Sequence, residues 1–414
     1  MAKIKPFYGV RPAADKILDV ASPPYDVLNS AEAREEVKGK PHSFLHVVKP
    51  EVDLPVDIDL YSEDVYQKGR ENLYKMLNEG VLIQDDKPCF YLYRLVMGDI
   101  DQIGLVVGAS IEDYEKGIIK KHEHTRAVKE ADRIKHVDTL NANTGPVFLT
   151  YRARKDINEI VDEIIKENPL YDIATEDEIK HIFWKIDQQN DIEKILSIFS
   201  DIDFLYVADG HHRSASGTKV GKTRREANSA HTGEEEYNYF LSVIFPDNQL
   251  YIMDYNRVVK DMHGNSVEDF LEKAAENFDV KVHSKTEGYS PNKLHNFGMY
   301  LDGTWYSLTA KDGTFDENDP VKSLDVAILQ DNLLNPILGI GDPRKDKRID
   351  FVGGIRGLEE LSGRVNKGEA VAFSMFPTSI EQLMAIADAD EVMPPKSTWF
   401  EPKLRSGVIT HLLD

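Results

Sequence analysis

The sequence is poor in cysteine, in long apolar stretches and in positive charge. Cys89 is the only cysteine among 414 residues, so no disulfide can form within the chain. This fits a reducing compartment, and the apolar run 89–93 is typical of a buried structural thiol. No apolar run approaches the ~18 residues that cross a bilayer, and the first residues lack the apolar segment of a secretory signal. These absences predict a cytoplasmic protein that does not enter a membrane.

The deficit of basic residues restricts the class of partner. The chain has 50 Lys and Arg against 72 Asp and Glu, a formal net charge of −22. Such a field repels polyanions, which argues against nucleic acid and anionic membranes as partners. It does not exclude a small phosphorylated ligand, because a local basic pocket can override the field of the whole molecule. We therefore expect small-molecule substrates.

The distribution of apolar residues predicts an α+β protein with prominent antiparallel pairs. Apolar residues make up 41% of the chain, enough for a real core, and 414 residues suggest two or three domains. Residues 88–97 and 103–111 read as strands joined by a turn at 97–99. Residues 62–79 read as a helix. Ser30 is expected to cap a helix that runs to Val37.

The pattern changes near residue 266, where a further set of helices and strands begins. We therefore expect a catalytic region over residues 1–260 and a C-terminal α+β region over residues 261–414. There is no internal repeat or low-complexity tract. The C-terminal region is expected to complete or cover the site.

The strongest local signal is the segment Tyr206-Val207-Ala208-Asp209-Gly210-His211-His212-Arg213. The apolar run 204–208 predicts a buried strand that ends abruptly at Asp209-Gly210. A helix is expected from His212 to Lys219, followed by an exposed connection over 221–236. The segment thus predicts a junction from strand to helix.

This junction has the chemistry of a phosphate site. The start of a helix offers unpaired N–H groups and a partial positive charge to an anion. Gly210 permits close approach of the backbone, and Arg213 can bind phosphate in a bidentate manner from an exposed helix start. His211 and His212 add cationic or donor groups, and Asp209 can cap the helix or hold Mg²⁺. The alternative is a capped helix with two solvent-facing histidines.

A second candidate is the segment from Lys120 to Arg126. In an extended chain His122 and His124 would share one face and Glu123 would point the other way. Glu123 is a candidate base for a substrate hydroxyl, and neighbouring basic residues can neutralise phosphate. The two histidines are candidates for substrate or metal binding. A solvated charged surface remains an equal alternative.

Two loops supply further candidates. Asn143 and Thr144, in the segment 141–146, can bind a ligand through amide and hydroxyl groups. Tyr25 and Asp26 follow two prolines, which hold them in fixed positions, and we expect them to contact substrate. An ordinary turn and plain loop architecture are the respective alternatives.

Five segments together resemble a known family. Ser-Pro-Pro-Tyr-Asp-Val at 22–27, His-Glu-His-Thr at 122–125, Asn-Thr-Gly-Pro at 143–146, Ala-Asp-Gly-His-His-Arg at 208–213 and Pro-Pro-Lys-Ser-Thr-Trp-Phe at 394–400 look like the bacterial and archaeal family called domain of unknown function 1015. The segments spread over nearly the whole chain, so the resemblance is specific.

The segment 209–213 is also similar to the signature of the ParB/sulfiredoxin-like superfamily, in the form found in free serine kinases. The resemblance implies a ParB/sulfiredoxin-like mixed sheet core with helices. It implies Asp209 near metal or phosphate and His211, His212 and Arg213 on phosphates. It further implies catalysis by a glutamate, for which Glu123 is the candidate, with ATP or ADP and Mg²⁺. Sulfiredoxin chemistry is excluded because the segment contains no cysteine.

The sequence thus predicts a nucleotide-dependent small-molecule kinase that converts free L-serine to O-phosphoserine. One alternative is a nucleotide-binding regulator like ParB, against which the charge of −22 speaks. The other is a metal-dependent hydrolase that uses His122, His124 and the histidine pair at 211–212.

Overall fold

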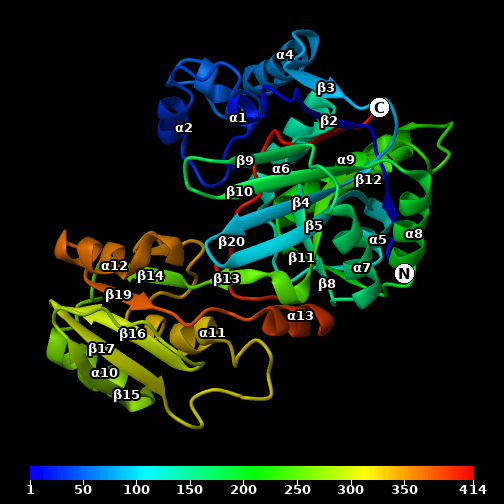
Figure 1. Ribbon diagram of the computed structural model, residues 1–414. Coiled ribbons are helices and arrows are strands. Elements are labelled where there is room, and N and C mark those ends of the chain that lie inside the picture. The colour runs from blue at the N-terminus through cyan, green and yellow to red at the C-terminus, as the bar shows by residue number, and fades with distance from the viewer. The chain divides into compact units, whose positions relative to one another are not determined.

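A computed structural model describes all 414 residues, and its chain divides into two compact units. The first unit contains Met1–Leu250 and Pro402–Asp414, and the second contains Tyr251–Glu401. The first unit therefore ends ten residues before the expected boundary at 260, and the last thirteen residues return to it. Figure 1 shows the elements of each unit in sequence colours. None of the helices is both long and apolar enough to cross a membrane.

A nine-stranded mixed sheet forms the centre of the first unit. Its strands run in the order β6-β11-β8-β12-β5-β4-β10-β9, with β1 paired to β5. β11 is parallel to β6 and β12 is parallel to β8, whereas the other pairs are antiparallel. The strands are β1 Ile4–Lys5, β4 Phe90–Met97, β5 Ile100–Ser110, β6 Ile119–Lys120, β8 Val147–Tyr151, β9 Tyr171–Ala174, β10 Lys180–Ile186, β11 Leu205–Asp209 and β12 Tyr239–Pro246. The predicted α+β class with a mixed sheet core is confirmed.

The hairpin of β4 and β5 follows the predicted turn. Met97 pairs with Ile100, so Gly98 and Asp99 form a two-residue loop. Gly98 has φ +57°, the left-handed conformation that tight hairpins require. Cys89 is buried beside this hairpin, as expected, and burial raises the pKa of its thiol to about 11.

A smaller sheet in the first unit contains the end of the chain. Its order is β3-β2-β21-β7, with β2 Gly9–Pro12, β3 Leu82–Gln84, β7 Ala142–Asn143 and β21 Thr410–Leu412. β21 therefore links the N-terminal segment to residues 142–143, a pairing that no local pattern predicts.

Nine α-helices pack around these sheets. They are α1 Ile17–Val20, α2 Ser30–Glu36, α3 Leu45–Val48, α4 Glu63–Asn78, α5 Ile111–Glu115, α6 Ala127–Leu140, α7 Lys155–Ile164, α8 Gln189–Phe199 and α9 His211–Ala227. A core cluster joins the central sheet to α5, α7 and α8 through residues such as Ile157, Ile192 and Phe199.

Two helix boundaries differ from the sequence predictions. α9 continues to Ala227, so residues 221–227 are helical and not an exposed connection. Within this extension, Gly221 allows close packing, because the carbonyl of Tyr237 lies 2.1 Å from where a Cβ would stand. The cap of α2 is Asn29 and not Ser30.

The second unit has its own antiparallel sheet with the order β15-β17-β16-β19-β14-β18, and a short β13-β20 pair. Its strands are β13 Tyr251–Met253, β14 Tyr255–Val259, β15 Phe278–Ser284, β16 Asn296–Leu301, β17 Thr304–Ala310, β18 Ile349–Gly353, β19 Val371–Ser374 and β20 Trp399–Glu401. Its α-helices are α10 Val267–Asn277, α11 Asp325–Leu329, α12 Gly357–Asn366 and α13 Ile380–Asp388. The conspicuous Trp399 has a packing role, since its indole lies against Gly353 and donates to Glu401 over 2.7 Å.

Candidate functional site

The predicted junction from strand to helix is present in the first unit. β11 ends at Asp209, Gly210 turns the chain, and α9 begins at His211. Gly210 has φ +95°, which L side chains rarely adopt. A Cβ there would also lie 3.3 Å from Nε of Arg213 and 3.4 Å from Cα of Val147. The backbone conformation therefore favours glycine here, and a side chain would in addition have to displace Arg213 slightly.

No side chain caps the start of α9. Gly210 is the N-cap residue, and its carbonyl accepts the N–H groups of Arg213 and Ser214 over 2.9 Å each. The N–H groups of His211 and His212 have no backbone partner of this kind. The expected capping by Asp209 is therefore wrong. Its Oδ1 instead accepts the N–H of Gly210 over 2.7 Å.

Asp209 is held by a lysine from the end of the chain. Nζ of Lys403 lies 3.0 Å from Oδ2 of Asp209. Burial raises the pKa of the Asp209 carboxyl, but Lys403 and Arg213 outweigh it and hold the pKa below its usual value. Asp209 is therefore ionised at neutral pH, and the charge of Lys403 belongs to this site.

His211 and His122 form a buried imidazole pair. Their ring centroids lie 4.4 Å apart at an interplanar angle of 86°. Nδ1 of His211 lies 3.7 Å from Oε2 of Glu123. Burial lowers the pKa of His211 to about 4. Burial and the neighbouring His211 lower the pKa of His122 well below its usual value. Burial and Arg126 also lower the pKa of His212. The histidines are therefore neutral donors and acceptors at pH 7, which is one of the two roles, cationic or donor, that the sequence left open.

Arg213 is buried and not an exposed residue of the helix start. Its side chain is 15% exposed, and Nη1 donates to the carbonyl of Pro146. Nη2 lies 3.8 Å from Oδ2 of Asp26. Burial lowers the pKa of the guanidinium, but Asp26 and Asp209 more than compensate and raise it. Arg213 therefore remains a cation within the protein.

Buried polar atoms without partners gather at this junction. Thirteen buried side-chain nitrogen and oxygen atoms in the chain have no hydrogen-bond partner, and four of them belong to this one cluster. They are Nδ1 of His122, Nε2 of His211, Nδ1 of His212 and Nε of Arg213. Buried polar groups in folded proteins are almost always paired. The concentration of unpaired ones here is typical of a site built for a polar ligand.

A small pocket of ≈ 30 Å³ lies beside Arg213. Two arginines, Arg133 and Arg213, line it, and no carboxylate does. The other lining residues are Pro24, Tyr25, Val48, His136, Val137, Asn143, Thr144, Gly145, Ser216 and Ser406. The structure thus brings together three sequence candidates: Tyr25, Asn143 and Thr144.

Arg133 and His136 are site residues that the sequence reading missed. They lie three positions apart on α6, so they share one face of that helix. The guanidinium of Arg133 stacks 4.4 Å from the ring centroid of Tyr25, and its Nη2 pairs with Asp132 over 2.8 Å. The spacing was available in the sequence, but it lay in a polar segment without other features.

The last residues of the chain connect the separate segments of the site. Ser406 pairs with Ser22 in a β-bridge, which fixes the loop that carries Tyr25. In β21, His411 pairs with Asn143, while Lys403 binds Asp209. One C-terminal segment therefore holds three motifs that are far apart in sequence.

His122 and His124 do not share the face that an extended chain would give them. His122 is buried, whereas His124 is exposed, because the chain bends at Glu123 instead of remaining extended. The structure also contains no group of three or more His, Cys, Asp or Glu side chains that could hold a metal ion.

Comparison with known proteins identifies a family. The family model described as "Protein of unknown function (DUF1015)" matches residues 4–327. No curated protein matches the sequence. Solved structures with partial similarity include a free serine kinase in complex with AMP, at 13% identity, covering 74% of this chain and 92% of that chain with a TM-score of 0.34.

Two other structures are similar to the same extent. A conserved hypothetical protein from Pyrococcus furiosus has 15% identity, covers 75% of this chain and 95% of that chain, and gives a TM-score of 0.35. SbnI with C-terminal truncation from Staphylococcus aureus has 11% identity, covers 73% and 85%, and gives 0.37. TM-scores this low assign no activity to the present chain. The family match spans most of the sequence, and the chain therefore belongs to the DUF1015 family, as its motifs predicted.

Proposed function

We propose that this protein is a nucleotide-dependent small-molecule kinase that transfers a phosphoryl group from ATP or ADP to free L-serine. The observation that carries the proposal is the uncapped start of α9, where four buried polar atoms lack partners. The resemblance of residues 209–213 to the free-serine-kinase signature supports the choice of ligand and of acceptor.

The phosphate groups of the nucleotide would bind at the start of α9. Nε of Arg213 is unpartnered. Its Nη2 lies 3.8 Å from Oδ2 of Asp26, which is a long distance for an ion pair, so phosphate oxygens can replace this contact. The N–H groups of His211 and His212 and the helix dipole add to the attraction. Phosphoryl transfer depends mainly on such positioning and charge neutralisation. Lys403 adds a second cation beside Asp209.

The small pocket next to Arg213 suits an anionic group of the acceptor. Two arginines and no carboxylate line it, while the paired carboxylates Asp132 and Asp26 lie outside the lining, so the pocket offers guanidinium donors to an anion. Its ≈ 30 Å³ accommodates a single group and not a whole molecule. The carboxylate of serine would fit beside Arg133, with Tyr25, Asn143 and Thr144 around it.

Glu123 is the proposed base. Its Oε2 lies 3.7 Å from Nδ1 of His211, the first residue of α9. In the transfer, the serine hydroxyl oxygen bonds to the terminal phosphorus as the bond from phosphorus to the bridging oxygen breaks. The hydroxyl proton passes to the Glu123 carboxylate, and the shortened nucleotide leaves with the bridging oxygen. A positioned carboxylate in this role typically contributes 10²–10⁴-fold to the rate.

Asp209 fits a Mg²⁺ ion only as a single protein ligand. Mg²⁺ often binds through one or two carboxylates, with phosphate oxygens and waters completing its shell. Such an ion would neutralise phosphate charge. Asp209 would have to share its Oδ2 with Lys403, which now lies 3.0 Å away. We also propose that the enzyme acts in the cytoplasm on small molecules and does not bind nucleic acid.

The direct test is incubation of the folded protein with L-serine, Mg²⁺ and either ATP or ADP, with detection of O-phosphoserine by mass spectrometry. We expect product with one donor, and a loss of at least about 100-fold in the rate for Glu123→Gln. Asp162→Asn, which removes an exposed carboxylate on α7, is the matched control and should retain full activity. A folded protein that binds nucleotide but makes no phosphoserine would exclude serine as the acceptor.

A further inference from the structure

The guanidinium of Arg133 is held along one edge and on one face. Its Nε donates to Oδ2 of Asp132 over 2.9 Å, and its Nη2 lies 2.8 Å from the same oxygen. The ring of Tyr25 stacks against it, with the ring centroid 4.4 Å away. The Arg133 side chain is 12% exposed. A long, flexible side chain is therefore fixed in one position before any ligand arrives.

The opposite end of this guanidinium is free. Arginine offers five N–H groups, and Asp132 occupies only the edge formed by Nε and Nη2. Nη1 pairs with no group of the chain, and Arg133 lines the pocket of ≈ 30 Å³. The end formed by Nη1 and Nη2 has the fork geometry that binds a carboxylate through two parallel hydrogen bonds. The pocket therefore has a fixed pair of donors without an acceptor.

Asp132 is itself fixed from a second helix. Its Oδ1 accepts the hydroxyl of Tyr66 on α4 over 3.0 Å, and Tyr66 is buried. Adjacent residues of a helix do not face each other, so the Arg133 side chain has to fold back to reach the carboxylate of Asp132. Both carboxylate oxygens of Asp132 are thus used within the chain, whereas Arg133 keeps one end available.

Arg224 shows the contrasting case of an arginine that is fully bonded. It lies on α9 and pairs with Asp138, another carboxylate of α6. Its Nε and Nη2 bond to Oδ1 of Asp138 over 3.1 and 2.8 Å, and its Nη1 bonds to Oδ1 of Asn141. No end of this guanidinium is left without a partner. The two arginine–aspartate pairs of α6 therefore differ in the free end of Arg133.

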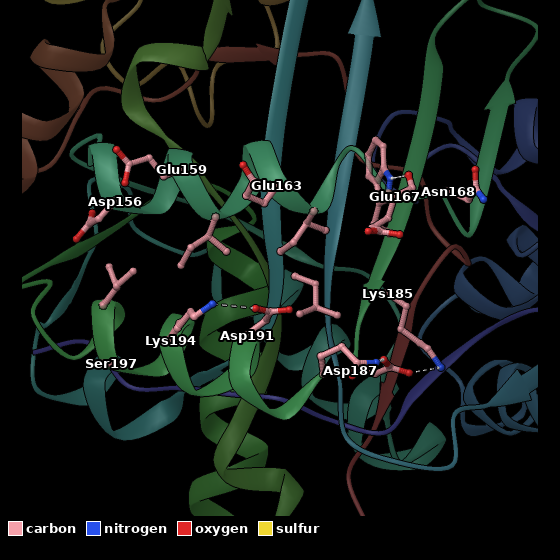
Figure 2. Close-up of a pocket in the computed structure, with 16 residues that line it drawn as sticks. Asp156, Glu159, Glu163, Glu167, Asn168, Lys185, Asp187, Asp191, Lys194 and Ser197 are labelled. Atoms are coloured by element: carbon pink, nitrogen blue, oxygen red, sulfur yellow. Dashed lines mark hydrogen bonds and ion pairs between the residues drawn. The ribbon is translucent and has the colours of Figure 1, made fainter.

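The larger groove between α7 and α8 has no comparable feature. Its volume is ≈ 650 Å³, and Figure 2 shows the side chains of both helices around it. Five of the six carboxylates that line it are in ion pairs, such as Asp191 with Lys194 over 3.4 Å and Asp187 with Lys185 over 3.2 Å. No arginine lines it. Nothing in that groove therefore offers the fork of donors that Arg133 presents.

We propose that Asp132 is a positioning residue of the acceptor site, which holds the free end of Arg133 in place for the carboxylate of the acceptor. The inference rests on the proposed function, in which this pocket receives the carboxylate of serine. A guanidinium already fixed by Asp132 and Tyr25 loses little freedom when the acceptor binds, so more of the interaction appears as affinity. Asp132 does not touch the acceptor and acts only through Arg133.

The test compares L-serine with L-serinamide, in which a neutral amide replaces the carboxylate. Calorimetric titration measures the affinity for each compound without requiring turnover. In Asp132→Asn, we expect the affinity for serine to fall about tenfold, because Arg133 is no longer held. The affinity for serinamide should stay within about twofold, because it lacks the group that Arg133 binds. In the kinase assay, the KM for serine should rise by the same factor with little change in kcat, as expected for a contact away from the transferred phosphoryl group.

Two further variants complete the comparison. Asp138→Asn makes the same substitution on the same helix at the carboxylate that pairs with Arg224 outside the pocket, and it should leave both affinities within about twofold. Tyr66→Phe removes only the hydrogen bond that anchors Asp132, and it should weaken serine binding about threefold and serinamide binding not at all. This milder variant decides the question if Asp132→Asn does not fold.

Equal losses for serine and serinamide in the variants at Asp132 and Tyr66 would overturn the proposal, because general loosening of the fold does not distinguish the two compounds. An equal loss in Asp138→Asn would overturn it as well. Wild-type protein that does not bind serine would remove both the inference and serine as the acceptor. Serine that binds with this dependence on Asp132, but is not phosphorylated, would contradict the proposed function and support the inference.

Discussion

The starts of α2 and α9 meet the same physical requirement in opposite ways. Both helices begin with N–H groups that have no partner within the helix. At α2, Oδ1 of Asn29 accepts the N–H groups of Ala31 and Glu32 over 2.9 and 3.0 Å, and Oε2 of Glu32 accepts the N–H of Asn29. At α9, the cap is Gly210, which has no side chain to accept anything.

The difference is informative because of burial. The start of α2 is largely exposed, where water would satisfy its N–H groups even without a cap, yet it is capped. The start of α9 is buried, where water cannot reach freely, yet it is uncapped and adjoined by His211 and Arg213 with unpaired nitrogen atoms. A buried helix end without its own partners is maintained at a cost in stability. We interpret this cost as a sign that a bound ligand supplies the missing hydrogen-bond acceptors.

Replacing Arg213, at the uncapped start of α9, should have the largest effect on nucleotide binding. In Arg213→Ala, we expect nucleotide affinity to fall roughly 100-fold, because a pair of charged hydrogen bonds to phosphate is lost. Isothermal titration with ATP and ADP measures this. The melting temperature should also fall, because the substitution leaves the carbonyl of Pro146 and the carboxylate of Asp26 without their partner.

Arg225→Ala provides the control for this experiment. Arg225 lies near the other end of α9, about 18 Å along the helix, where it pairs with Glu115 over 2.9 Å. It makes the same substitution on the same helix and should leave nucleotide affinity unchanged. Arg213→Lys, which keeps the charge without the bidentate geometry, should fall between the two. Unchanged affinity in a folded Arg213→Ala protein would remove the phosphate site from this junction.

The burial of His211 predicts a dependence of stability on pH. Its pKa is about 4 in the folded protein and about 6.5 in an unfolded chain, so the unfolded state binds more protons between these values. Stability is therefore fully present above pH 6.5 and is lost as the pH falls toward 4. Between pH 7 and pH 5, the wild type should lose about 1–2 kcal/mol more than His211→Gln, which has no proton to bind.

Urea unfolding of both proteins at the two pH values measures this difference. His124→Gln is the control, because it makes the same substitution at an exposed histidine outside the buried cluster. Saturating nucleotide should reduce the effect in the wild type, since a bound phosphate favours protonated imidazole. Equal acid sensitivity of the wild type and His211→Gln would mean that His211 is not held neutral by burial.

The contrast between the helix starts also shows how far the sequence leads. The apolar run before Asp209, the glycine and the helix after it are local signals, and the junction was predictable from them. The closure of the site was not, because it depends on Lys403, Ser406 and His411 returning from the end of the chain to segments hundreds of residues earlier. A sequence pattern carries no information about such pairing unless the pairing residues are themselves periodic.

The errors at single residues have the same origin. His122 and His124 would share one face in an extended strand, but a bend at Glu123 separates them. Arg213 was expected at an exposed helix start, but Pro146 and Asp26 cover it. In each case the local rule was sound, and tertiary contacts changed its outcome.

The smallest effect is expected at the capped helix. Asn29→Ala should lower the free energy of unfolding by about 1 kcal/mol, the usual cost of removing an N-cap acceptor. It should leave nucleotide affinity unchanged, because α2 meets its own requirement. Asn29→Asp keeps an acceptor oxygen and should restore most of the stability. Hydrogen exchange at the N–H groups of Ala31 and Glu32 should accelerate in Asn29→Ala alone.

At α9, the same measurement should show slower exchange at His211 and His212 when nucleotide is added, and a lack of protection there would mean that the uncapped helix start is not where the phosphates bind.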